Sequence, residues 1–87
     1  MELVITDTAR EDIRFFLKSG QSNLVKKIEQ LLTSIKETPF TGLGKPEPLK
    51  HEYTGKWSRR ISSEHRVIYE VRDSSIFILS FKGHYKK

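Results

Sequence analysis

Three stretches in the second half of the chain are strand candidates, and only short links separate them. They are residues 56–61, 66–72 and 76–82, and in the second of them Val67, Tyr69 and Val71 alternate with Arg66, Ile68 and Glu70. The links at residues 62–65 and 73–75 have the length of hairpin turns. The pattern therefore predicts an antiparallel meander. In its third strand, the residues expected on one face are Phe77, Leu79 and Phe81.

The N-terminal part of the chain has the features of a strand followed by a helix. Residues 2–6 are rich in β-branched side chains, which favour a strand. Thr8 and Glu11 have the spacing of a capping box, and Asp7 adds the negative charge that stabilises a helix start. Gly20 suits the left-handed conformation that ends many helices. The apolar face predicted for this helix consists of Ala9, Ile13, Phe16 and Leu17.

A second amphipathic helix is predicted over residues 22–37, where Thr38 and Pro39 end it. Its inner stripe is expected to contain Val25, Ile28, Leu32 and Ile35, widened by Leu24 and Leu31. The order strand, helix, helix, meander predicts an α+β fold with both helices packed on one face of the sheet. The length of 87 residues is that of one domain, spanning residues 1–87.

The composition limits the classes of function. The formal charge is +5, from 16 Lys and Arg against 11 Asp and Glu, and this sign favours a polyanionic or acidic partner. Lys86 and Lys87 supply two of these charges, so the local distribution says more than the total. Without cysteine there is neither a disulfide framework nor a thiolate zinc site. No apolar run approaches a membrane span, and the N-terminus lacks a signal peptide, so we expect a cytoplasmic protein.

Glu47 stands between two prolines in a basic loop that covers residues 40–51. Pro46 and Pro48 have fixed φ angles and no N–H, which makes this a poor central strand. Lys45 and Glu47 each precede a proline and are expected to be extended. We therefore predict a stiff surface segment that points the Glu47 carboxylate in one direction.

Chemically useful side chains are expected to meet at one end of the meander. The end of its third strand lies beside the start of its second, which brings His84 and Tyr85 to Arg66. A carboxylate, an imidazole and fixed cations are sufficient to cleave RNA without a metal. Glu47 is the candidate base for the ribose 2′-OH, Arg66 the phosphate stabiliser and His84 the acid for the 5′ oxygen, while Tyr85 orients the phosphate or stacks on a base. The expected phosphate- and substrate-binding residues are Lys50, His51 and Arg60.

Simpler roles remain open for several of these residues. Arg59 and Arg60 must face opposite sides of the sheet, so at most one of them points into a given site, and Glu11, Glu70 and Asp73 are available partners for the other. His65 is more typical of a structural residue beside a turn, Trp57 of a core residue and His51 of an exposed one. The histidines lack the spacing of a zinc helix, so no metal is expected. A non-catalytic RNA-binding or ribosome-binding module, or a cleft for an acidic peptide, would use the same basic surface.

The chain resembles the YoeB/Txe family of bacterial toxins, within the wider RelE-like group. Several of its segments occur in the same order and with the same spacing as in that family. The resemblance covers residues 1–85 and is strongest in Thr38-Pro39-Phe40, Gly44 to His51, Trp57 to Ile61 and Glu64-His65-Arg66, with Tyr69 and His84-Tyr85. The chain departs from the family pattern at its end, where Lys86 and Lys87 follow Tyr85.

The resemblance implies a ribosome-dependent mRNA endonuclease of a toxin–antitoxin system, with a fold similar to that of small microbial ribonucleases. It also implies a homodimer, a cognate antitoxin of the YefM/Phd-like type, a ribosome partner at the A site and contact with operator DNA only through the antitoxin complex. Carried over by position, Glu47 matches the general base, His84 the general acid, Arg66 the phosphate-stabilising arginine and Tyr85 the terminal tyrosine. Lys50 and Arg60 match basic positions around the cleft.

Overall fold

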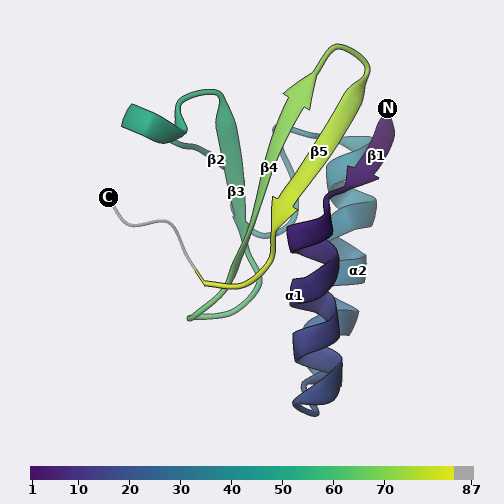
Figure 1. Cartoon of the computed structure of the whole chain (residues 1–87). Helices are drawn as coiled ribbons and strands as arrows, with labels where there is room; N and C mark the ends of the chain where they lie inside the picture. The colour runs from purple at the N-terminus through teal and green to yellow at the C-terminus, as the bar shows by residue number, and fades with distance from the viewer. Residues whose placement is uncertain (84–87) are drawn as a thin grey trace.

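The computed structural model describes residues 1–83. Two helices and a five-stranded sheet account for most of this part of the chain (Figure 1). The elements are, in order, β1 (Glu2–Ile5), α1 (Asp7–Lys18), α2 (Ser22–Glu37), β2 (Glu47–Pro48), the 3₁₀ helix η1 (His51–Tyr53), β3 (Lys56–Arg60), β4 (Arg66–Arg72) and β5 (Ser75–Ser80). The predicted bounds of the second helix and of the second meander strand are confirmed, and the other predicted strands differ by one or two residues at their ends.

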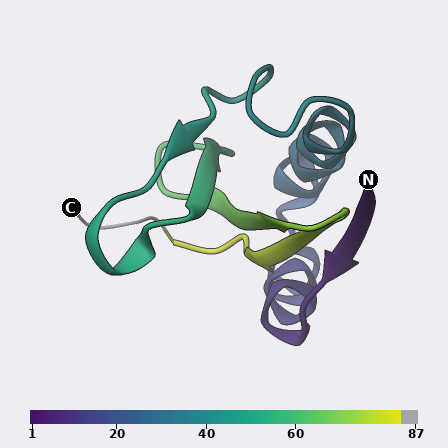
Figure 2. The ribbon, with the colours of Figure 1, turned by 90° about the horizontal axis from the view of Figure 1, so that it is seen from above.

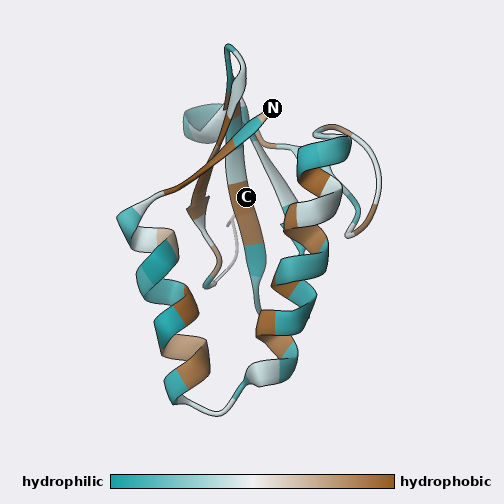
Figure 3. Cartoon of the chain, turned by 90° about the vertical axis from the view of Figure 1, so that its right-hand side faces the viewer, coloured by the Kyte–Doolittle hydropathy of each residue, from teal (hydrophilic) through white to brown (hydrophobic). Residues whose placement is uncertain are grey.

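The sheet is mixed, with strand order β1-β5-β4-β3-β2. The predicted antiparallel meander is confirmed as β3, β4 and β5. β1 pairs parallel with β5, and β2 pairs antiparallel with β3 at the opposite edge. Both helices lie on the same side of the sheet (Figure 3). The segment that contains η1 lies on the other side (Figure 2). The α+β fold with both α-helices on one sheet face is therefore confirmed, and no α-helix of residues 1–83 covers the second face.

The core lies between the helices and the sheet. Its buried members include Phe16 of α1, Val67 and Tyr69 of β4, and Ile76 and Ile78 of β5. In α2 the fully buried residues are Ile28, Leu31 and Ile35, whereas Leu24, Val25 and Leu32 pack only partly against the core.

Two predictions about the helix faces were wrong. Leu31, not Leu32, is central in α2, because the contact with the sheet follows a spacing of three and then four residues from Ile28. Leu17 is 56% exposed, since it lies about 100° around α1 from the buried Phe16.

The predicted common face of Phe77, Leu79 and Phe81 was wrong at Phe81. Ile76 and Ile78 are the fully buried residues of β5, and Phe81, beyond the end of the strand, is buried in the core with them. The pairing of β4 with β5 shifts register between Ile68 and Tyr69, and β5 ends at Ser80, so alternation does not extend to Phe81. The Asp12 carboxylate accepts hydrogen bonds from the N–H groups of Phe81 (2.9 Å) and Lys82 (3.2 Å), which fixes this new direction of the chain.

The start of α1 differs from the predicted capping box. Thr6, not Thr8, is the N-cap, and its hydroxyl accepts from the N–H of Ala9 at 3.3 Å. The same hydroxyl donates to the carbonyl of Ile78 at 2.8 Å, so one side chain joins the helix to β5. At the other end, the prediction for Gly20 is confirmed: its φ is 74°, and the N–H of Gln21 donates to the carbonyl of Phe16 at 2.9 Å.

We predict that Thr6→Ala lowers the free energy of unfolding by about 1–2 kcal/mol, because the helix loses its cap and β5 loses a hydrogen bond. Thr8→Ala is the matched control. Thr8 is exposed within α1, where alanine is the better helix former, so its effect should stay within about 0.5 kcal/mol. Urea unfolding followed by circular dichroism measures both, and a larger loss from Thr8→Ala would contradict the assignment of the cap.

Candidate active site on the open face of the sheet

The sheet face opposite the helices, called here the open face, carries a charged row of side chains. Directly paired residues share a face, and the register pairs Glu47 with Ser58 and Arg60 with Arg66. Arg59, which alternates with these residues, reaches Ser34 of α2 and so marks the helix side. The charged row therefore consists of Glu47 of β2, Arg60 of β3 and Arg66 of β4, all on the open face.

Glu47 is positioned by its place in the edge strand β2. The N–H of Arg60 donates to the carbonyl of Gly44 at 2.7 Å, and Glu47 is then the residue opposite Ser58. Gly44 has a φ of 85°, and a Cβ there would lie 2.6 Å from Cδ2 of Leu31 and 3.1 Å from the carbonyl oxygen of Arg60. Only glycine allows this close approach, which delivers the proline-flanked carboxylate to the sheet edge.

The prediction of an extended Lys45 was wrong. Its φ is 54°, so Gly44 and Lys45 both have left-handed conformations. Together they turn the chain from the loop onto the edge of β3, and β2 begins two residues later. Glu47 is extended as predicted, and β2 is an edge strand, as the missing proline donors require.

Arg60 and Arg66 are directly opposite each other on neighbouring strands. Like charges in this position repel and destabilise a sheet, because the two Cβ atoms are only about 5 Å apart. Within residues 1–83 the ion pairs are Arg14 with Glu11 and Arg72 with Glu70, so no described carboxylate pairs with either Arg60 or Arg66. Such a pair is a site where an anion would relieve repulsion.

The chain beyond β5 returns to the start of β4. The N–H of Arg66 donates to the carbonyl of Gly83 at 2.9 Å, and the N–H of Gly83 donates to Nδ1 of His65 at 2.8 Å. His65 also packs its ring against Phe16, with centroids 5.0 Å apart, so its predicted structural role is confirmed. His84 and Tyr85, the other two candidate catalytic residues, lie outside the described residues.

Lys50 and His51 lie at the other end of β3 from the two arginines. The N–H of Leu49 donates to the carbonyl of Lys56 at 2.9 Å, and η1 begins at His51, which has a φ of 59°. Both side chains are exposed. The backbone therefore places Glu47 between the Arg60–Arg66 pair on one side and Lys50 and His51 on the other.

Arg59 is the functional residue that sequence reasoning missed, because alternation shows only that it faces inward. It is fully buried, and within residues 1–83 it forms no ion pair with Glu11, Glu70 or Asp73, the acids considered as possible partners. All five N–H donors of the guanidinium have acceptors instead. These are the hydroxyls of Tyr69 (3.0 Å) and Ser34 (2.7 Å) and the carbonyls of Leu43 (3.1 Å), Thr41 (2.9 Å) and Thr38.

Tyr69 completes this network. Its hydroxyl donates to the carbonyl of Pro39 at 2.7 Å while it accepts from Nε of Arg59. Burial raises the pKa of the Tyr69 phenol, and the adjacent Arg59 offsets part of that rise. The phenol thus remains a neutral donor at physiological pH, and the loop from Thr38 to Leu43 is attached to the sheet by two side chains.

We predict that Arg59→Met lowers the free energy of unfolding by about 3 kcal/mol or more, because several buried carbonyls lose their donors at once. Arg60→Met is the matched control, since the adjacent side chain is exposed and faces a second arginine. Its effect should be near zero or slightly stabilising. Urea unfolding measures both, and equal losses from the two variants would contradict the assigned role of Arg59.

Trp57 packs partly against the core and against Phe40, with ring centroids 4.9 Å apart, as expected for a structural residue. Within residues 1–83, no group of three or more His, Asp or Glu side chains is arranged to hold a metal ion. None of the helices in this part of the chain has both the length and the apolar character needed to cross a membrane.

A mixed five-stranded sheet with two helices on one face is a small α+β fold of the RelE-like type. The YoeB/ParE toxin from Agrobacterium tumefaciens has this fold, with a TM-score of 0.90, 42% identity and coverage of 98% of this chain and 100% of that one. The chain belongs to the family of YoeB-like toxins of bacterial type II toxin–antitoxin systems, which it matches over residues 5–85.

Two other similar proteins support the family assignment. The YoeB toxin of Escherichia coli K12 is 42% identical over 85 residues, which cover 98% of this chain and 100% of the relative. YoeB from Staphylococcus aureus, solved as a dimer, is 43% identical with a TM-score of 0.85 and coverage of 98% of each chain. The same toxin has also been solved in complex with YefM.

Proposed function

We propose that this toxin is an endoribonuclease that cleaves mRNA on the ribosome and thereby inhibits translation. The observation that carries the proposal is that Glu47, Arg60 and Arg66 lie on one face, where neither arginine has an ion pair with a described carboxylate. This combination suits an RNA phosphodiester. The arginines attract the negative charge of its phosphate, and the carboxylate can remove the proton of the neighbouring 2′-OH.

In the proposed reaction, the Glu47 carboxylate accepts the proton of a ribose 2′-OH. The 2′ oxygen attacks the adjacent phosphorus in line, and the bond from phosphorus to the 5′ oxygen breaks. Arg66 and Arg60 stabilise the additional negative charge on the phosphoryl oxygens. The products are a 2′,3′-cyclic phosphate and a 5′-OH, and the requirement for a 2′-OH restricts the reaction to RNA.

His84 is proposed as the general acid that protonates the departing 5′ oxygen, and Tyr85 as its neighbour on the phosphate. Their sequence position supports this role, since they follow Gly83, whose carbonyl accepts from the N–H of Arg66. Lys50 and His51 are proposed to contact flanking phosphates from the other side of Glu47, as the positions of their exposed side chains allow.

The partners follow from the family. We propose that a YefM-like antitoxin inhibits this toxin and that the toxin forms a homodimer, in analogy to the Staphylococcus aureus protein, which has been solved both as a dimer and with YefM. Operator DNA would be contacted only through the antitoxin complex. Cleavage of mRNA on the ribosome would require the active toxin to be in the cytoplasm, with the ribosome as the second partner.

We predict that Glu47→Gln reduces mRNA cleavage on programmed ribosomes by about 10²–10⁴-fold, the usual contribution of a general base. Glu52→Gln is the matched control, because this exposed acid of η1 undergoes the same loss of charge. The cleaved 3′ ends should carry a cyclic phosphate. Wild-type rates in a folded Glu47→Gln variant would remove its role, and ribosome binding without any cleavage by the wild type would favour a non-catalytic binding module.

His84→Ala is expected to slow cleavage by at least about 10²-fold, because an alkoxide is a poor leaving group without a proton. The defect should largely disappear with an mRNA that carries sulfur in place of the bridging 5′ oxygen, since a thiolate leaves without protonation. Single-turnover rates on programmed ribosomes with the two substrates make the comparison. An equal defect on both substrates would show that His84 acts in some other way than as the acid.

A further inference from the structure

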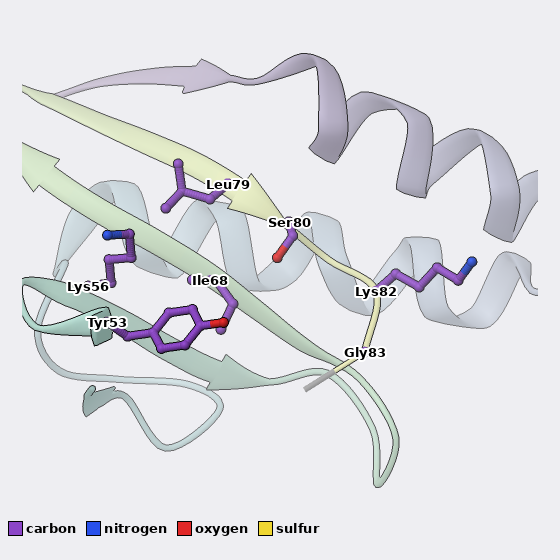
Figure 4. Close-up of a pocket in the computed structure, with 7 residues that line it drawn as sticks. All are labelled: Tyr53, Lys56, Ile68, Leu79, Ser80, Lys82 and Gly83. Atoms are coloured by element: carbon purple, nitrogen blue, oxygen red, sulfur yellow. The ribbon is translucent and has the colours of Figure 1, made fainter. Parts of the chain in front are cut away.

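The open face contains a pocket beside the charged row. Its volume is about 270 Å³, and it is partly open to solvent. Figure 4 shows the residues that line it. The residues that line it are Tyr53, Lys56, Ile68, Leu79, Ser80, Lys82 and Gly83. They come from η1, from β3 to β5 and from the segment after β5, so the pocket lies across the strands and η1 forms one wall.

The register places this pocket within one nucleotide of the proposed reaction centre. Ile68 follows Arg66 by two residues on the same face of β4, a distance of about 7 Å. Ile68 also pairs with Ser58, which pairs with Glu47, so Ile68 is two strands and about 10 Å from Glu47. Gly83, which lines the pocket, accepts the backbone hydrogen bond of Arg66.

The walls of the pocket suit a flat apolar ring. Ile68 and Leu79 project toward the space from neighbouring strands, and the ring of Tyr53 extends across it toward Ile68 (Figure 4). A volume just below the roughly 300–1,000 Å³ of pockets for drug-sized ligands fits one small ring system. Such walls favour an aromatic base over a phosphate or a carboxylate.

Polar groups at the rim are few. Ser80 contributes a hydroxyl and Lys56 an ammonium group, both of which can bond to the edge of a base. The Lys82 ammonium lies 3.8 Å from the ring centroid of Phe15 on α1, and Figure 4 shows its side chain directed away from Tyr53. The pocket therefore combines stacking surfaces with a small number of groups that distinguish one base edge from another.

We propose that this pocket holds one unstacked base of the single-stranded mRNA next to the cleaved phosphodiester and sets the base preference at that position. Proteins that read single-stranded RNA commonly stack its bases on aromatic side chains and bond to their edges. Tyr53 supplies the stacking surface, and Ser80 and Lys56 read the edge. The proposal rests on the proposed nuclease function, because that function brings RNA to the open face.

The first test uses ribosomes programmed with mRNAs that vary at each base around the cleavage site. Tyr53→Ala should raise KM about tenfold or more and remove the preference at one position, because a stacked base contributes this much to binding. Tyr53→Phe keeps the aromatic ring and should retain the wild-type KM and the base preference. Phe40→Ala is the matched control, an exposed aromatic residue that packs on Trp57 on the helix side of the sheet. An unchanged KM and base preference in Tyr53→Ala would overturn the proposal.

The second test separates the pocket from the reaction. In a Glu47→Gln background, short single-stranded RNAs with a 2′-deoxy group at the cleavage site are titrated, and the methyl NMR signals of Ile68 and Leu79 are followed. We expect saturable shifts that depend on the base and that Tyr53→Ala weakens at least tenfold.

If the wild type does not cleave mRNA but the base-dependent NMR shifts occur, the nuclease proposal is wrong and the proposal of a base-binding pocket is supported. If cleavage occurs without base-dependent shifts and Tyr53→Ala impairs only antitoxin binding, the pocket proposal is wrong and its occupant is a protein.

Discussion

The hydrogen bonding of one buried guanidinium holds the irregular part of this molecule together. Arg59 directs all of its N–H groups at hydroxyls and carbonyls, three of which belong to the loop between α2 and β2. The carbonyl end of α2 carries a partial negative charge, which compensates a buried cation without a carboxylate. With the loop held, Gly44 reaches the edge of β3 and Glu47 takes its place opposite Ser58. The position of the candidate base thus depends on a side chain on the opposite face of the sheet.

Much of the fold could be predicted because it follows from the local periodicity of apolar residues and from local turn and cap residues. The bounds of α2, the meander and the left-handed Gly20 all follow from patterns within a few residues. The predictions that failed depended on partners distant in sequence. Thr6 became the cap because β5 offers the carbonyl of Ile78 to the same hydroxyl, and Phe81 turned inward because Asp12 holds its N–H. For the site, the alternation of side chains along a strand shows that Arg59 and Arg60 face opposite sides of the sheet. The sequence of one segment does not show that Arg60 pairs with Arg66 across the strands, or which groups accept hydrogen bonds from Arg59.

The open face illustrates how a site is maintained at a cost to stability. Arg60 and Arg66 repel each other across the strands, while the core on the other face is well packed. On the helix side of the same two strands, the next residues, Arg59 of β3 and Val67 of β4, are paired with each other and fully buried. The binding of an anion would convert the repulsion into attraction, so the stability of the toxin should be linked to the occupancy of the face.

The prolines on either side of Glu47 have a further effect, on association between molecules. β2 is an outer strand, and an outer strand with unpaired N–H and C=O groups is a template on which other chains add strands and aggregate. Pro46 and Pro48 offer no N–H for such growth, and a segment of only two paired residues is too short to guide it. The protein thereby gains protection from strand addition at this margin of its sheet.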